Sequence, residues 1–152
     1  MHTIIDACHQ FFENTSGISL ITLNVQSLKA HFEDIITDTI IPTAEFLIFT
    51  ESWLKNDEYI DVPGYKCLTQ FKREELRVGG TIIYQKNSSE LMTISVINPI
   101  SVNQNSNFCG DICGVKLSSN KISFWLIGVH ISPGNSLKNT YSKLSFSRII
   151  FF

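Results

Sequence analysis

The sequence lacks the features that would assign it to a specialised class of protein. It has no apolar run of the roughly 18 residues needed to cross a bilayer, no internal repeat and no low-complexity segment. Twelve basic and 14 acidic residues give a formal net charge of only −2. A nucleic-acid partner would therefore have to be bound by a local basic patch. With 152 residues, 43% of them hydrophobic, the chain is expected to fold as one compact domain.

Cysteine is too sparse and too irregularly spaced to predict a disulfide framework. No hydrophobic segment typical of a secretory signal follows Met1, so we expect an intracellular protein, nuclear or cytoplasmic, with reduced thiols. Cys109 and Cys113 form a CxxxC, but no Cys or His pair at zinc-finger spacing completes a set of four ligands, which favours structural thiols. The G-x-S-x-G signature of serine hydrolases and the phosphate-binding P-loop are also absent.

The first half of the chain alternates helical and strand patterns. Apolar residues recur at helical spacing within residues 4–12 and predict a short N-terminal helix, which "NTSG" ends. Ile18 to Leu23 reads as a buried strand, and a second helical pattern from Leu28 is closed by Pro42. Phe46 to Phe49 is the second predicted strand. The order strand, helix, strand suggests a βαβ-like unit.

The second half is richer in strands. We predict strands near 65–68, 81–84, 91–97, 111–117 and 122–129, the last two joined by a turn at "SSNK". Trp125, inside an apolar strand, is expected in the core. The predicted fold class is α+β, with several strands and few helices.

Polar residues stand at the carboxyl ends of the first two predicted strands. Asn24 follows the first and Glu51 the second. Open α/β sheets place ligands at this edge, and a carboxylate beside a carboxamide suits Mg²⁺, which prefers oxygen ligands. From spacing alone the alternative is that both residues cap turns.

Five blocks of the sequence, in order and in spacing, together resemble one known family. They are "LNVQSL", "FLIFTESWL", "VPGYKC", "RVGGTIIY" and "LIGVHISPGNS". The stretch 18–136 resembles the front half of the endonuclease/exonuclease/phosphatase family, and most of all the endonuclease domains of mobile elements, namely non-LTR retrotransposons and Helitron-type helicases. The resemblance divides the chain into an N-terminal helical extension (1–17), a partial domain (18–136) and a tail outside the family pattern (137–152).

The resemblance implies a truncated four-layer α/β sandwich with mixed sheets, and a metal-dependent nuclease. Asn24 matches the family's active-site Asn, and Glu51 matches the Glu that binds the catalytic Mg²⁺. Gln26 falls where relatives carry a second polar residue and is a further candidate at the metal. Mg²⁺ would act as a Lewis acid on the scissile phosphate. The implied partner is DNA, with fusion to a helicase or a reverse transcriptase by analogy.

Two departures from the family bear on activity. His130 stands where relatives of this kind carry an active-site Tyr; it could contact a phosphate, although a single His at a strand end can equally be structural. After Pro133 the sequence has no Asp, Glu or His, so the residues that position and deprotonate the attacking water are missing. Loss of a positioned base costs about 10² to 10⁴ in rate. We therefore expect a domain that is incomplete and weakly active or inactive alone.

A basic loop and the C-terminal segment are two further features of the sequence. Lys72, Arg73 and Arg77 could contact a DNA backbone, or the loop could simply be solvated, since it also contains acidic residues. The ending "FSRIIFF" is expected to be an unpaired, β-prone segment. The alternative function is a catalytically dead remnant that acts as a nucleic-acid-binding or interaction module.

Overall fold

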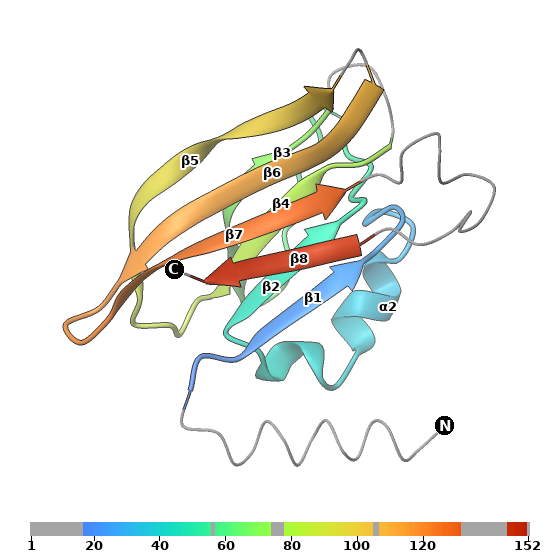
Figure 1. Ribbon diagram of the computed structural model, residues 1–152. Helices are drawn as coiled ribbons and strands as arrows, with labels where there is room; N and C mark the ends of the chain where they lie inside the picture. Colours follow the sequence, from blue (N-terminus) through green and yellow to red (C-terminus); the bar gives the residue numbers. More distant parts are fainter. Residues whose placement is uncertain (1–16, 56, 74–77, 105–106, 132–145, 152) are drawn as a thin grey trace.

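The computed structural model describes residues 17–55, 57–73, 78–104, 107–131 and 146–151, and within them the chain forms two four-stranded sheets (Figure 1). The predicted helix at 4–12 and most of the segment 137–152 lie outside the described residues. The strands are β1 (Leu20–Asn24), β2 (Phe46–Thr50), β3 (Tyr65–Phe71), β4 (Thr81–Lys86), β5 (Met92–Gln104), β6 (Asn107–Ser118), β7 (Ser123–Ile131) and β8 (Phe146–Phe151).

The first sheet has the order β1-β2-β4-β3 and contains the predicted βαβ-like unit. β1 and β2 are parallel neighbours, while β4 runs antiparallel to both β2 and β3. The connection between β1 and β2 holds the helix α2 (Phe32–Thr37) and a 3-10 turn (Ile41–Thr43) that has Pro42 in its first positions. Because β1 and β2 are parallel, their carboxyl ends lie at the same edge of the sheet.

The second sheet has the order β5-β6-β7-β8 and is antiparallel throughout. The expectation of mixed sheets therefore holds for the first sheet only. The predicted "SSNK" turn joins β6 to β7, and the Ser119 N–H donates to the carbonyl of Ile122 at 2.8 Å. The prediction that the terminal segment is unpaired was wrong, because β8 pairs with β7 along its whole length. A β-prone segment next to an exposed strand edge gains backbone hydrogen bonds by pairing.

The two sheets pack face to face, and one helix covers the first sheet on its other side. Between the sheets, Phe46 and Ile48 of β2 lie in one apolar cluster with Val115 and Leu126. On the other side of the first sheet, Ile35 of α2 lies in a second cluster with the alternate β2 residues, such as Phe49. The architecture is thus α+β, and in the described part of the chain it comprises a helical layer and two sheets.

Trp125 does not lie in the core as predicted. It is half-buried beside Lys116, whose ammonium lies 5.9 Å from the centroid of a Trp125 ring, while its neighbour Leu126 is buried. Successive strand residues point to opposite faces, so only one of the two can face the first sheet. Among the described residues, no helix has both the length and the apolar character of a membrane span.

Candidate functional site

The rim at the carboxyl ends of β1 and β2 carries a row of polar residues. Asn24, the last residue of β1, is in register with Thr50, the last of β2, and Thr50 is in register with Thr81, the first of β4. Residues in register on neighbouring strands point to the same face of a sheet. Glu51 directly follows Thr50. The prediction that Asn24 and Glu51 belong to neighbouring strand ends is therefore confirmed.

Three backbone segments meet at this rim: one follows β1, one follows β2 and one precedes β4. Hydrogen bonds join them, and several of their residues have unusual dihedral angles. Ser27 N–H donates to the Glu51 carbonyl at 2.8 Å, and Trp53 N–H donates to the Gly79 carbonyl at 3.0 Å. In the described part of the chain, the four non-glycine residues with positive φ all lie here: Gln26 (41°), Ser27 (90°), Glu51 (56°) and Trp53 (54°). Such a backbone is costly for residues with a side chain, and costs of this kind cluster at functional sites.

The Glu51 carboxylate accepts two hydrogen bonds and forms one ion pair. Its Oε2 accepts from the Trp53 indole N–H at 2.6 Å and from the Gly79 backbone N–H at 3.0 Å. Its Oε1 lies 2.6 Å from Nε2 of His130, which β7 supplies from the second sheet. The structure therefore brings together Glu51 and His130, two residues that the sequence analysis selected separately.

His130 is in turn connected to a fully buried carboxylate. Its Nδ1 lies 3.7 Å from Oδ2 of Asp111, the residue in register with His130 on β6. Asp111 also accepts from Arg73 Nε at 3.3 Å and Nη2 at 3.1 Å, and from the Gly80 backbone N–H at 2.8 Å. The side chains of His130 and Asp111 are 1% and 0% exposed. Glu51, His130, Asp111 and Arg73 thus form one ion-paired cluster, here called the rim cluster.

Burial and ion pairing act in opposite directions on the pKa values of this cluster. For Glu51, burial alone would raise the pKa, but the contacts from His130 and Trp53 and the charge of His130 lower it to about 2. For His130, burial alone would lower the pKa, but Asp111 and Glu51 raise it to about 9. At neutral pH the cluster therefore contains an ionised Glu51 and a protonated His130.

The glycine pair that precedes β4 has no room for side chains. A Cβ on Gly79 would come within 2.5 Å of both Arg73 and Asp111, and a Cβ on Gly80 within 2.4 Å of Ser52 Oγ. Both residues also have positive φ, 75° and 87°. Glycine is therefore needed here for both space and conformation, which lets the backbone N–H groups reach the carboxylates.

The predicted nucleic-acid contacts lie in different environments. Arg73 is 13% exposed and belongs to the rim cluster. Lys72 donates to the Glu58 carbonyl, and its ammonium lies 3.9 Å from the centroid of the Tyr59 ring. Arg77 lies outside the described residues. Gln26, the further candidate at the metal, is exposed at the rim beside Asn24.

Sequence reasoning missed Asp111 as a site residue. Asp111 was noted only as the start of a strand, yet it begins the alternation that buries Cys113, Val115 and Leu117. Its position in that alternation, on the buried face, was the available signal, because a buried carboxylate needs a charged or hydrogen-bonding partner.

The ligand types at the rim fit Mg²⁺. Glu51 would supply an ionised carboxylate that Trp53 and Gly79 hold in place, and Asn24 and Gln26 are exposed carboxamides at and just after the end of β1. Among the described residues, no group of three or more His, Cys, Asp or Glu is arranged to hold a metal ion. Mg²⁺ commonly takes only one or two protein carboxylates and keeps several waters, so a single Glu remains compatible with it.

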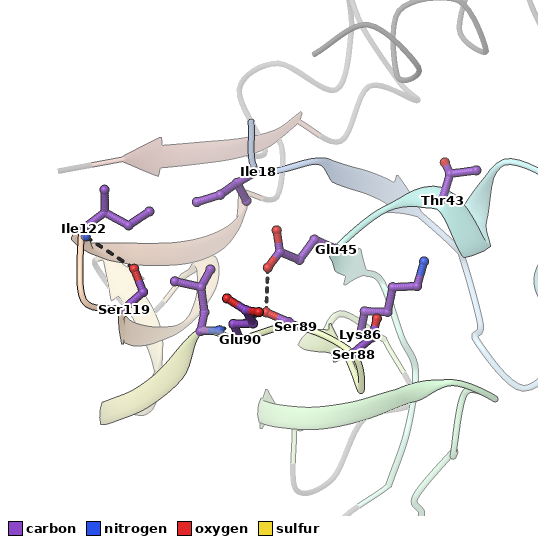
Figure 2. Close-up of a pocket in the computed structure, with 10 residues that line it drawn as sticks. Ile18, Thr43, Glu45, Lys86, Ser88, Ser89, Glu90, Ser119 and Ile122 are labelled. Atoms are coloured by element: carbon purple, nitrogen blue, oxygen red, sulfur yellow. Dashed lines mark hydrogen bonds between the residues drawn. The ribbon is translucent and has the colours of Figure 1, made fainter. Parts of the chain in front are cut away.

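A hollow of about 460 Å³ lies at the opposite rim of the two sheets (Figure 2). It is lined in part by Glu45, which precedes β2, by Lys86, the last residue of β4, and by Ile122 near the β6–β7 turn. Glu45 Oε1 accepts from Ser89 at 2.5 Å, and Lys86 Nζ donates to the Pro42 carbonyl at 2.6 Å. These polar groups bond to other groups of the chain, and no predicted site residue lines the hollow.

Comparison with known proteins adds no assignment: no protein-family model matches the chain, and no curated protein matches it significantly.

Proposed function

We propose that this chain is a Mg²⁺-dependent phosphodiester endonuclease-like domain of the endonuclease/exonuclease/phosphatase kind, of mobile-element origin, with DNA as its substrate. One observation carries the proposal. Asn24 ends β1, Glu51 directly follows the parallel strand β2 at the same rim, and His130 reaches Glu51 from the second sheet. The three residues that the resemblance assigns to one active site thus come from three strands to a single rim.

The face-to-face packing of the two sheets supports the truncated sandwich that the resemblance implies. Gly128 of β7 lies so close to the first sheet that a Cβ there would come within 2.8 Å of Thr81 and 3.0 Å of Ile48. His130 follows two residues later and so points to the same face as Gly128. Close packing at Gly128 therefore fixes His130 above the end of β2.

Each rim residue has a role in the proposed reaction. Glu51 and the carboxamides of Asn24 and Gln26 would hold Mg²⁺, which when bound would supply Lewis-acid stabilisation of the phosphate. Trp53 and Gly79 fix the orientation of Glu51. The Asn24 amide could also donate a hydrogen bond to a phosphate oxygen, since Asn24 is exposed at the rim.

Turnover is expected to be slow because the charged residues described at the rim do not include an accessible base. Asp111 and His130 are buried and ion-paired to other residues of the cluster. A missing general base lowers the rate by about 10² to 10⁴. The expected activity is therefore slow, Mg²⁺-dependent nicking.

Nicking of supercoiled plasmid by the purified chain tests this function. We expect slow conversion to the open circle with Mg²⁺, abolished by EDTA and by Glu51→Gln, and reduced by Asn24→Ala. Glu33→Gln is the matched control, because Glu33 is an exposed acidic residue of α2 that does not belong to the rim cluster. Nicking that survives Glu51→Gln would contradict the proposed site. Folded wild-type protein that does not nick at all would favour the binding remnant instead.

A further inference from the structure

Both oxygens of the Glu51 carboxylate are already engaged by groups of the protein itself. Oε2 accepts two hydrogen bonds, from Trp53 and Gly79, while Oε1 faces Nε2 of His130 at 2.6 Å. The contact between Oε1 and Nε2 is an ion pair, and the imidazole takes up the space at Oε1 that a cation bound to that oxygen would need.

The imidazole is held in that position by the fold. It is 1% exposed, and its second nitrogen lies 3.7 Å from Asp111, which Arg73 and Gly80 fix in turn. Gly128, two residues before His130, lies against the first sheet. The imidazole cannot swing into solvent without breaking these contacts. The contacts around His130 therefore hold its ion pair with Glu51 in place.

We propose that His130 antagonises metal binding: its Nε2 occupies the Oε1 position through which Glu51 would bind Mg²⁺, so the ion pair and the metal exclude each other. The inference rests on the proposed function, in which Glu51 is the metal ligand. It makes His130 a determinant of metal affinity and not itself a ligand. An apolar side chain in place of the imidazole would leave that oxygen to the metal.

Metal affinity measured without catalysis tests this inference. Mn²⁺ is the probe, since it accepts the same oxygen ligands as Mg²⁺ and is visible by electron paramagnetic resonance. We expect His130→Leu, which has neither a donor nor a metal ligand, to bind Mn²⁺ on the order of tenfold more tightly than the wild type, a typical size for coupling between two binding events. His31→Leu is the matched control, because His31 is an exposed histidine paired with Asp34. The double variant Glu51→Gln/His130→Leu is expected to lose the gain.

The outcomes separate the inference from the proposed function. Equal or weaker Mn²⁺ binding by His130→Leu would overturn the inference, and weaker binding would identify His130 as a ligand. Absence of Mn²⁺ binding in every variant would overturn the metal site itself and the inference with it. If His130→Leu does not fold, the wild type provides the test. Mg²⁺ is then expected to shift the imidazole ¹⁵N resonances of His130 but not those of His31, and Mg²⁺ binding without a His130 shift would overturn the inference.

Discussion

The two rims of the sandwich differ in their number of energetically unfavourable features. The rim at the ends of β1 and β2 contains buried charges and all the non-glycine residues with positive φ in the described part of the chain. The opposite rim has a hollow of about 460 Å³, but its polar groups make ordinary bonds near the surface. Buried charges and unusual dihedral angles are destabilising unless other contacts compensate for them. In this molecule, buried charges and unusual dihedral angles indicate the candidate site better than the volume of a hollow does.

The largest expected difference between the rims is in the free energy of unfolding that is lost when one carboxylate is removed from each. Asp111→Ala leaves Arg73 and His130 without their buried partner, and breaking a buried ion pair costs about 3–5 kcal/mol. Glu90→Ala, at an exposed residue lining the hollow, is expected to change stability by no more than about 0.5 kcal/mol. Urea denaturation followed by circular dichroism measures both. Similar losses in the two variants would remove the distinction between the rims.

Substitution of Gly80 at the rim is expected to have the next largest effect. Comparison with Gly64 separates the cost of steric overlap from the cost of a positive φ. Gly64→Ala places a side chain at φ 81° with no atom within 4 Å, so it tests conformation alone, with an expected cost of about 1–2 kcal/mol. Gly80→Ala adds a Cβ only 2.4 Å from Ser52 Oγ and is expected to cost about 1 kcal/mol more, through overpacking. The same denaturation experiment compares them. Equal costs would show that the rim has room for a side chain.

The positions of the first strand ends could be predicted from sequence because local patterns determine them. The apolar runs before Asn24 and Glu51, and the helical pattern between them, indicate a parallel pair whose ends share a rim. The contact between Glu51 and His130 could not be predicted, because it depends on how closely two sheets pack. That distance is set at Gly128, where the absence of a side chain lets β7 approach the first sheet.

The remaining differences between prediction and structure have specific causes. Trp125 was placed in the core because its strand is apolar on both faces, and composition alone does not show which face is inward. The pairing of β8 is a long-range contact for which "FSRIIF" has β-propensity but no signal naming its partner. The positive φ values at Gln26 and Glu51 have no sequence signal, since neither residue type favours that region.

The pH dependence of stability is the smallest expected effect, and it tests whether His130 is the charged partner of Glu51. The pKa of His130 is raised to about 9 in the folded chain from an ordinary value of 6.5. Its stabilising contribution is therefore fully present below pH 6.5 and lost as the pH rises through 9. We expect the melting temperature to fall on the order of 5 °C over this range, and His130→Gln to remove most of the fall.

Lys86→Gln, at the opposite rim, is the control for that profile and is expected to keep the fall of the wild type. Between pH 5 and 6.5 both Glu51, whose pKa is lowered to about 2, and His130 are charged, so the ion pair is complete there. A His130→Gln profile parallel to that of the wild type would mean that His130 is not charged in the folded chain. Its 2.6 Å contact with Glu51 would then oppose a metal cation by occupying Oε1 and not by charge.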